Sequence, residues 1–397
     1  MRIVDIICTT DAESGGPIEA VRRISEVLAQ DGHTVTVVSL ETQEVASRRT
    51  YKGAVTAVGV GPGVAGRYRY NTELDRWMRQ HADEFDVAIA HGVWNYSSIG
   101  MWRALRRHPL PYFIFMHGML DPWFSEQYPL KHWLKQIYWL ALEGRVLRDA
   151  DAVLFTCEEE RLRARNVFRG FSYREQVVMY GTAAPTGDPE QQKKAFVEAF
   201  PGLKGRQWLL FISRVHPKKG CDLLIEAFAQ CLPELPADLD LAIAGPDQVG
   251  IIPELQALAS RLGVAERVHW TGMLTGDLKW GALHGAEAMV LPSHQENFGF
   301  VVAEAMACST PVLISDKVNI WREVLEYGGG MVESDTLEGT CRLIRRLLAL
   351  SAEERAAMGK GGKVAFHRYF DIETTARDFA LTIGKIAGID ISVPVAS

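Results

Sequence analysis

Short apolar runs alternate along the chain with longer stretches in which apolar residues recur every three or four positions. The short runs are rich in Val, Ile and Leu, which is typical of strands buried on both faces. In the first half of the chain we predict strands at residues 2–8, 33–40, 54–60, 85–91, 111–116, 152–156 and 176–179. In the second half we predict strands at residues 208–213, 239–244, 268–271, 288–291 and 311–315.

Helical patterns lie between most of these strands. One is expected at residues 18–30, with Val21, Ile24 and Leu28 on its apolar face, and another at residues 221–231. Alternating strands and helices predict parallel sheets joined by right-handed crossovers. We therefore predict an α/β protein with two parallel-sheet domains.

The two halves are separated by a stretch rich in turn-forming residues. Gly181, Pro185, Gly187 and Pro189 follow one another closely and predict a linker, so we expect domains at residues 1–185 and 190–368. A last helical pattern at residues 369–386 is expected to pack on one of them. Because open parallel sheets bind ligands at the carboxyl ends of their strands, two such sheets facing each other predict an interdomain cleft.

Composition narrows the class of protein. Of the 397 residues, 47% are hydrophobic and 23% charged, and the formal net charge of -6 gives no general attraction to nucleic acid. The six cysteines form no C-x-x-C pair and the histidines show no metal-ligand spacing, so we expect neither a disulfide scaffold nor a metal site. Asp5 interrupts the first apolar run, and no uncharged apolar segment approaches a membrane span. We expect a cytoplasmic protein and leave open a peripheral membrane contact.

The segment at residues 293–307 carries the strongest candidate chemistry. Glu296 follows a predicted strand, and Asn297, Phe298 and Gly299 would form the first turn of a helix, where free backbone N–H groups suit an anion or a sugar hydroxyl. Glu304 lies in an apolar helical stretch, where a carboxylate needs a partner. The alternative is a solvated loop acid and a helix acid favoured by the dipole.

A second segment, residues 211–220, places two cations after a strand. Arg214 follows the strand end and Lys219 precedes the next helix, an arrangement that can hold a diphosphate and stabilise it as a leaving group. An exposed basic turn is the alternative. We interpret Lys218 as a bystander and His216 as structural.

The first half offers glycine and histidine at strand ends. Gly15 and Gly16 follow the first strand and open a helix, which suits close approach of a phosphate, although G-x-G-x-x-G is absent and a dehydrogenase is disfavoured. His117 follows a strand and precedes a glycine, so we expect it to project into the cleft, where it could contact a bound sugar. His91 and Asp121 are acceptor-side candidates.

Residues 131–148 interleave basic and aromatic side chains. Such a helix can lie on an anionic membrane surface, which would suit a lipid-linked acceptor. The alternative is a surface helix whose aromatic residues pack inward.

Taken together, these motifs resemble those of glycosyltransferase group 1, also called family GT4. The match lies in Arg214 with Lys219, in Glu296 followed by Glu304 as an E-x7-E motif, and in the N-terminal glycine pair with His117. The resemblance implies a GT-B fold of two Rossmann-like domains, no essential metal or cofactor, and transfer with retention. It also implies that the first domain binds the acceptor, that the second binds the donor, and that the C-terminal helix at residues 369–390 packs back on the first domain.

The resemblance further implies residue roles. His117, Arg214, Lys219 and Glu296 would form the catalytic set, with the two cations on the diphosphate and Glu296 on the donor sugar. The remaining donor-site residues would be Gly15 and Gly16 near the phosphate, Asn297, Phe298 and Gly299 through their amides, Glu304 on the ribose, and Gly272, Met273 and Leu274 at the nucleobase.

The implied reaction is front-face substitution, in which the acceptor hydroxyl attacks from the side that the diphosphate leaves. Expected partners are a nucleotide sugar, either GDP-mannose or a UDP-hexose, and a glycan or lipid-linked acceptor of bacterial polysaccharide or lipopolysaccharide biosynthesis. Alternatives are an inactive nucleotide-sugar binding protein, or another GT-B enzyme such as a nucleotide-sugar epimerase or a phosphorylase.

Overall fold

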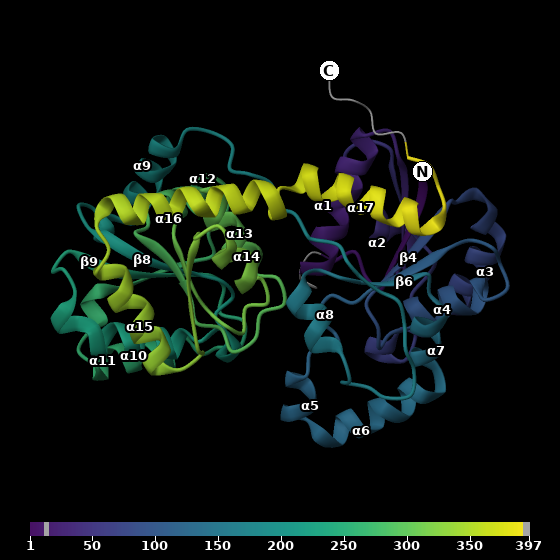
Figure 1. Cartoon of the computed structure of the whole chain (residues 1–397), viewed down its shortest axis with the longest axis horizontal. Helices are drawn as coiled ribbons and strands as arrows, with labels where there is room; N and C mark the ends of the chain where they lie inside the picture. The colour runs from purple at the N-terminus through teal and green to yellow at the C-terminus, as the bar shows by residue number, and fades with distance from the viewer. Residues whose placement is uncertain (12–15, 392–397) are drawn as a thin grey trace. The chain divides into compact units, whose positions relative to one another are not determined.

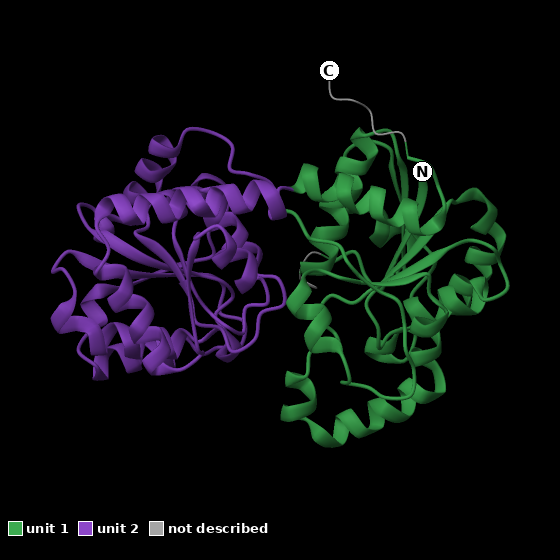
Figure 2. Ribbon diagram, viewed as in Figure 1, with its two compact units in different colours: residues 1–181, 372–397 green, residues 182–371 purple. Residues whose placement is uncertain are grey.

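Two compact units make up the chain. The structure, a computed structural model, describes residues 1–11 and 16–391. Unit 1 comprises Met1–Gly181 together with Ile372–Ser397, and unit 2 comprises Thr182–Asp371 (Figure 2). The boundary at residue 181 lies at the start of the glycine- and proline-rich stretch between the halves.

Unit 1 is built on a seven-stranded sheet in the order β3-β2-β1-β4-β5-β6-β7, in which every neighbouring pair is parallel. Its strands are β1 Arg2–Ile7, β2 Thr34–Ser39, β3 Val55–Gly59, β4 Val87–His91, β5 Tyr112–Phe115, β6 Ala152–Phe155 and β7 Glu175–Val177. Its helices are α1 Gly16–Gln30, α2 Gln43–Ser47, α3 Thr72–His81, α4 Tyr96–Leu105, α5 Trp123–Gln127, α6 Pro129–Tyr138, α7 Gly144–Asp149, α8 Glu158–Ala164 and α17 Ile372–Ala387 (Figure 1). A π-helical turn, η4 Trp139–Glu143, joins α6 to α7.

Unit 2 repeats the design with a six-stranded parallel sheet in the order β10-β9-β8-β11-β12-β13. Its strands are β8 Gln207–Ile212, β9 Leu239–Ala244, β10 Val268–Gly272, β11 Ala288–Leu291, β12 Val312–Ser315 and β13 Gly330–Glu333. Its helices are α9 Pro189–Ala199, α10 Cys221–Cys231, α11 Ile252–Arg261, α12 Gly276–Gly285, α13 Phe300–Ala307, α14 Trp321–Glu326, α15 Leu337–Leu348 and α16 Ala352–Ala365.

The predicted α/β fold with two parallel sheets is confirmed, and each predicted strand is present within a few residues of its expected bounds. The sequence pattern missed β13, a four-residue edge strand (Gly330–Glu333) that contains two polar or flexible positions. The tail helix begins at Ile372 rather than at residue 369, because residues 366–370 form a π-helical turn that continues α16. Phe370 of that turn is buried against Phe298 in unit 2.

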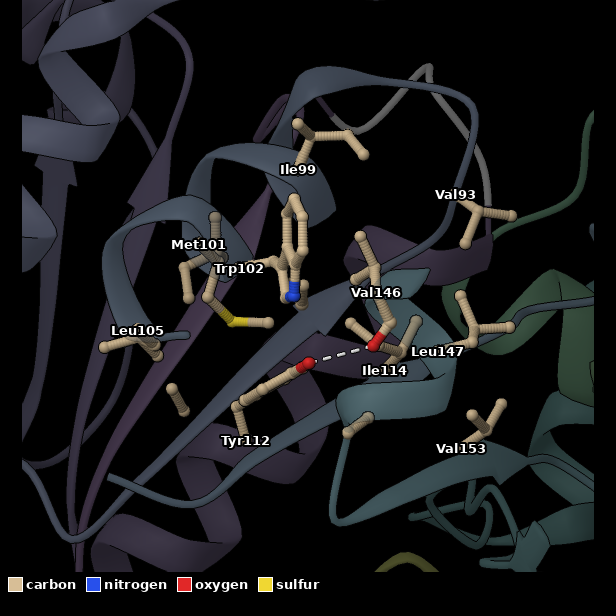
Figure 3. Packing of buried hydrophobic residues seen from close by; sticks show 14 of the residues in the cluster. Val93, Ile99, Met101, Trp102, Leu105, Tyr112, Ile114, Val146, Leu147 and Val153 are labelled. Carbon is tan, nitrogen blue, oxygen red and sulfur yellow. Dashed lines mark hydrogen bonds between the residues drawn. The ribbon is translucent and has the colours of Figure 1, made fainter. Parts of the chain in front are cut away.

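The core of unit 1 explains why its strands are apolar throughout. Helices cover both faces of the sheet, so both sets of strand side chains are buried. On one face, Ile99 and Trp102 of α4 and Val146 of α7 pack over the sheet, and the Tyr112 hydroxyl donates a hydrogen bond of 2.9 Å to the Val146 carbonyl (Figure 3). The buried phenol keeps its hydroxyl satisfied in this way.

Helix α17 returns the chain to unit 1. It packs against α1, and the Arg377 guanidinium lies 2.8 Å from the Asp31 carboxylate just beyond the end of α1. Its buried face includes Ala376, Phe379 and Ile383, at the spacing that the sequence pattern indicated.

The strand orders place the candidate residues. In each sheet the order reverses between two central neighbours, β1 and β4 in unit 1 and β8 and β11 in unit 2. Loops leaving two such strands go to opposite sides of the sheet, and open parallel sheets commonly bind ligands at the carboxyl ends of these strands. Gly16 follows β1 and His91 is the last residue of β4. Arg214 and Lys219 follow β8, and Glu296 follows β11.

Candidate active site

Two loops of unit 2 are held together at the switch point of its sheet. The loop after β8 contains Gly220, whose φ of 68° is left-handed, and a Cβ there would lie 2.3 Å from the carbonyl oxygen of Pro292. Glycine is therefore required for the loop to approach the exit of β11 so closely. The amide of His294 also donates to the Lys218 carbonyl at 2.8 Å. These contacts bring the 214–220 and 292–299 loops side by side.

Lys219 and Glu296 meet where these loops touch. The Lys219 ammonium donates a hydrogen bond to the Glu296 carboxylate, although the two residues are 77 positions apart in the chain. Their side chains are only 9% and 20% exposed. Glu296 is itself anchored, because its amide donates to the Lys317 carbonyl and its carbonyl accepts from the Asn319 amide, each at 3.0 Å. A half-buried ion pair at a strand end can exchange its partner for a charged or hydroxylated ligand.

Positive charge accumulates beside this pair. Arg214 is exposed and has no carboxylate partner among the residues that the structure describes. Burial lowers the pKa of His216, and the neighbouring charges of Lys218, Arg214 and Lys219 lower it further. The His216 ring accepts a hydrogen bond of 3.1 Å from the Lys218 amide, which supports the structural role expected for it. Arg214 thus remains available to an anion.

The start of α13 differs from the sequence prediction. Asn297, Phe298 and Gly299 are not the first turn of the helix, because the helix begins at Phe300 with Gly299 as its N-cap at a φ of 78°. A left-handed N-cap reverses the chain sharply, which only glycine does without strain. The Phe298 side chain is buried against Phe300 and Phe370, so its ring is not available to a ligand. The Asn297 amide oxygen accepts from the Asn319 side chain at 3.4 Å.

Glu304 has the partner that its apolar surroundings require. It is buried in α13, and its carboxylate lies 2.9 Å from the ammonium of Lys279 on α12. The Thr182 hydroxyl donates to the same oxygen at 3.4 Å. Sequence reasoning missed both partners, since neither belongs to a motif. Packing of α12 beside α13 brings Lys279 near, and Thr182 comes from the separate segment that precedes α9.

The third predicted donor segment ends β10. Gly272 accepts a hydrogen bond of 2.7 Å from the Gly245 amide at the end of β9, and its φ is 67°. Met273 is 70% exposed, whereas Leu274 is buried. Gly245, with a φ of 141°, lies so close to the Ser213 carbonyl that a Cβ would clash with it. The exits of β8, β9 and β10 are therefore in contact, with an exposed thioether at their rim.

Unit 1 carries a different arrangement at its switch point, a chain of four polar side chains. His91, at the end of β4, contacts Asp5 of β1 at 2.9 Å through Nε2 and His117 at 3.0 Å through Nδ1. The other ring nitrogen of His117 contacts the Tyr180 hydroxyl. With both histidines neutral, Tyr180 donates to His117, His117 donates to His91 and His91 donates to the Asp5 carboxylate. We call these four residues the unit 1 relay.

Asp5 and Tyr180 were missed as site residues, although the sequence contained a signal for one of them. A carboxylate inside an otherwise apolar strand needs a partner when buried, and Asp5 is such a residue. Burial and the neighbouring His91 hold the pKa of His117 well below its ordinary value, and burial raises the pKa of Tyr180. His117 is thus neutral near pH 7, with both ring nitrogens engaged inside unit 1.

The backbone around His117 is constrained as well. Its φ of 51° is left-handed, and the next residue, Gly118, has a φ of 78°. The Gly118 amide donates to the carboxylate of Glu160, which also accepts from the amide and hydroxyl of Thr156 at 2.6 Å each. A left-handed non-glycine residue persists only where its surroundings hold it, and such positions cluster at functional sites.

The other unit 1 candidates differ in their surroundings. Asp121 is buried, accepts from the Trp123 amide at 2.8 Å and lies 3.4 Å from Arg163, so its side chain stabilises the start of α5. Gly16 is the first residue of α1, and Gly15 lies outside the described residues.

A hollow of about 730 Å³ opens beside the end of β1. It is lined by Thr9, Thr10, Asp11, Arg22, Glu41, Val45, Arg48, Arg49, Thr50 and Arg69. The guanidinium groups of Arg22, Arg48 and Arg49 are all paired with glutamates within 2.8 Å. The hollow therefore offers many hydrogen-bonding groups without a strong excess of positive charge, which suits a polyhydroxylated ligand better than a highly charged one.

Within residues 1–11 and 16–391, no group of three or more His, Cys, Asp and Glu side chains is arranged to hold a metal ion. Across the same residues, every helix is too short or too polar to cross a bilayer. All six cysteines are free thiols.

Family models match both halves of the chain. A family model described as glycosyl transferases group 1 matches residues 191–365, and one described as glycosyl transferase 4-like domain matches residues 15–182. A D-inositol 3-phosphate glycosyltransferase of Segniliparus rotundus is 31% identical over 238 residues, or 59% of this chain. The match spans 52% of that relative, about half its length.

Solved structures share the fold over nearly the whole chain. Sucrose-phosphate synthase (tll1590) from Thermosynechococcus elongatus is 19% identical and aligns with a TM-score of 0.77 over 98% of this chain and 100% of that one. Anabaena Alr3699/HepE in complex with UDP-glucose is 18% identical, with a TM-score of 0.73 over 97% of this chain and 100% of that one. Since the two family models match one unit each and the fold is GT-B throughout, the chain belongs to the glycosyltransferase group 1 family, GT4.

Proposed function

We propose that this protein transfers a hexose from a nucleoside diphosphate sugar, GDP-mannose or a UDP-hexose, to a hydroxyl of a glycan or lipid-linked acceptor. In this proposal unit 2 binds the donor and unit 1 binds the acceptor. The acceptor belongs to bacterial polysaccharide or lipopolysaccharide synthesis, and the enzyme works in the cytoplasm, peripherally on the inner face of the membrane.

The observation that carries the proposal is the Lys219–Glu296 pair beside the unpaired Arg214. A sugar diphosphate has a doubly charged tail and a head of hydroxyls, which need cations and carboxylates respectively. When such a ligand arrives, Lys219 turns from Glu296 to a phosphate oxygen and frees the carboxylate for sugar hydroxyls. Arg214 and Lys219 then stabilise the charge that develops on the departing diphosphate.

Glu304 is proposed to bind the ribose. Its carboxylate has two oxygens, and the Lys279 ammonium and the Thr182 hydroxyl both donate to Oε1. A ribose carries two neighbouring hydroxyls that a carboxylate accepts in a bidentate way. A UDP-glucose complex among the structural neighbours supports a nucleotide sugar as donor.

We further propose that transfer proceeds with retention and without a metal ion. Front-face attack needs no covalent nucleophile, and the leaving phosphate oxygen takes the acceptor proton. The acceptor is proposed to enter the hollow beside the end of β1, where Thr9, Thr10 and Arg69 offer hydrogen bonds to hydroxyls. The name of the Segniliparus rotundus relative contains inositol 3-phosphate, whose ring hydroxyls are groups that this hollow could bind.

A panel of nucleotide sugars tests the donor assignment directly. Thermal unfolding is measured with each compound, because a ligand that binds only the native state raises its stability. We expect one nucleotide family to raise the midpoint and its diphosphate to compete. Release of nucleoside diphosphate is then followed with and without candidate acceptors, in EDTA, and the anomeric configuration of the product is read by NMR.

The outcomes separate the proposal from its alternatives. Binding without turnover on any acceptor would indicate an inactive nucleotide-sugar binding protein, and nucleotide release without acceptor would indicate an epimerase. An inverted product, or loss of turnover in EDTA, would overturn the corresponding part of the mechanism.

A further inference from the structure

A patch of unit 1 exposes large apolar side chains to solvent. We call this patch the α5–α6 apolar face, and it consists of Phe124, Tyr128, Leu130, Trp133, Leu134, Ile137 and Leu140. Helix α6 has no buried residue at all. Scattered single apolar residues are normal on a protein surface, but a contiguous set this large marks an interaction site.

The residues lie on one side of α6. Leu130, Trp133, Leu134 and Ile137 follow the spacing i, i+3, i+4 and i+7, which places them in one stripe along the helix. The other side faces the protein, where the Lys135 ammonium lies 4.5 Å from the centre of the Trp94 ring. The inward packing that the sequence allowed as an alternative therefore holds for Trp139, which is buried, and not for Trp133, which is 60% exposed.

Positive charge borders the stripe. Glu126 is the only acidic residue between Pro122 and Leu142, whereas the ammonium of the exposed Lys131 lies 4.8 Å from the centre of the Tyr128 ring. Beside Trp133 lies a hollow of about 510 Å³, and Arg163, Arg165 and Arg169 are among the residues that line it. The Arg169 guanidinium is exposed and pairs with no carboxylate in the described part of the chain.

The shape and the charge of the α5–α6 apolar face together indicate what it binds. Helices α5 and α6 form an outer edge of unit 1, with no other element of that unit beyond them (Figure 1). A convex apolar stripe with aromatic residues and a basic border suits a planar surface with apolar interior and anionic headgroups. A second copy of this chain would instead place like charges, Lys131 and Arg169, near their own counterparts across a two-fold axis, with Glu126 as the one carboxylate between Pro122 and Leu142 to offset them.

We propose that the α5–α6 apolar face docks on the surface of an anionic phospholipid bilayer. Leu130, Trp133, Leu134 and Ile137 enter the boundary between headgroups and acyl chains. Lys131 and Arg169 contact lipid phosphates. This surface deepens the proposed function, on which it rests only for the suggestion that the acceptor is lipid-linked.

Co-sedimentation of the full chain with vesicles tests the surface. One set of vesicles is pure phosphatidylcholine, and in the other roughly a third of the lipid is phosphatidylglycerol. We expect at least about tenfold more protein on the anionic vesicles at low salt, and a marked decrease at high salt. A Trp133→Ser/Leu134→Ser double variant should lose this binding, and Lys131→Glu with Arg169→Glu should lose its dependence on the anionic lipid.

A matched control also replaces two exposed apolar side chains with serine, but in unit 2. Leu325→Ser/Val364→Ser removes two apolar side chains that are 44% and 52% exposed in unit 2, and should leave vesicle binding unchanged. Nucleotide binding is measured on every variant, so that loss of vesicle binding with intact donor binding is assigned to the surface. If the native chain ignores anionic vesicles while it binds donor, or if Trp133→Ser/Leu134→Ser abolishes a dimer and not vesicle binding, the proposal is wrong and the proposed glycosyltransferase function stands.

Discussion

The two units use the same sheet topology to build two different kinds of polar site. In unit 2 the charged pair of Lys219 and Glu296 lies at the switch point between β8 and β11. A second charged pair, Lys279 with Glu304, lies on the neighbouring helices α12 and α13. In unit 1 the switch point between β1 and β4 holds Asp5 and His91 of the relay, in which His117 is neutral near pH 7.

The two polar sites differ in whether their side chains can exchange a protein partner for a ligand. A half-buried ion pair satisfies itself only until a ligand offers a better partner, so its groups are available for binding. The relay uses both nitrogens of each imidazole within unit 1, so its groups hold a geometry more than they offer contacts. Substitutions in unit 2 are therefore expected to remove binding and charge stabilisation, whereas substitutions in the relay are expected to disturb alignment.

The largest effect is expected at the Lys219–Glu296 pair. Lys219→Ala removes a cation from the leaving diphosphate, and transfer should fall by about a hundredfold or more. Glu296→Ala removes the carboxylate proposed to bind the sugar hydroxyls, and it should lower the rate of transfer by a similar factor. Initial rates of nucleoside diphosphate release measure both.

Lys218→Ala is the matched control, because it removes the same charge one residue away. It should retain most of the activity, with circular dichroism and thermal unfolding confirming that all three variants fold. Near-normal turnover of Lys219→Ala would remove that residue from the proposed catalytic set.

A smaller effect is expected at Glu304. Glu304→Gln keeps the shape but loses the charge-assisted hydrogen bonds to the ribose, and the dissociation constant for the nucleoside diphosphate should rise roughly tenfold to a hundredfold. Isothermal titration calorimetry measures the change. Glu338→Gln, an exposed acid in the first turn of α15, serves as the control; equal affinities of the two variants would contradict the ribose assignment.

The relay should respond in a different way. Asp5→Asn removes the carboxylate that orients His91 and, through it, the His117 tautomer, and kcat should fall roughly tenfold to a hundredfold with little change in donor affinity. Nitrogen NMR of the His117 ring reports its tautomer, which a merely destabilising substitution would not alter. Tyr180→Phe should shift the same signals, because it removes the donor to Nδ1; unchanged tautomers in both variants would exclude a positioning role.

The smallest effect on transfer, and a clear one on stability, is expected at a buried carboxylate outside both sites. Glu143 is buried in η4 without a cationic partner among the described residues, accepts from the Ser98 hydroxyl at 2.7 Å, and burial raises its pKa to about 7. Its protonated form favours the folded state, so this stabilisation is complete below its ordinary pKa and is lost as the pH rises through about 7.

Glu143→Gln mimics the protonated form and tests this sign. At about pH 8 the variant should be more stable than the native chain by about 2 kcal/mol, and the difference should shrink as the pH is lowered toward about 4. Urea unfolding across this range provides the measurement. A variant that is less stable at every pH would show that the Ser98 contact, and not the ionisation, dominates. Lys279–Glu304 offers the contrast, since its carboxylate is paired with a cation.

Much of the fold follows from local sequence pattern. Strands buried on both faces must be apolar throughout, so they are visible as short runs of Val, Ile and Leu, and turn residues mark their ends. The short edge strand β13 was not predicted, because an edge position tolerates polar residues and the strand therefore lacks a continuous apolar run. Gly299 was identified as a special position, but its left-handed N-cap and the later start of α13 depend on how the loop turns against Val318.

The motif residues were likewise accessible from the sequence, because each follows a predicted strand. Their partners were not. Lys219 reaches Glu296 only because β8 and β11 are neighbours in the sheet, and this strand order cannot be read from the sequence alone. Lys279 and Thr182 reach Glu304 through packing of separate segments. Asp5 interrupts an apolar strand in the sequence, but only the structure shows its contact with His91.

The sequence by itself determined the elements, the two-part division and the charged residues at the strand ends, because these depend on burial and on turn chemistry over a few positions. Only the tertiary structure decided which charges meet, which histidine nitrogens are occupied, and that the apolar side of α6 faces solvent. The physical reason is that periodicity places side chains on a face of a helix or strand, whereas the order of strands and the packing of helices determine what lies opposite that face.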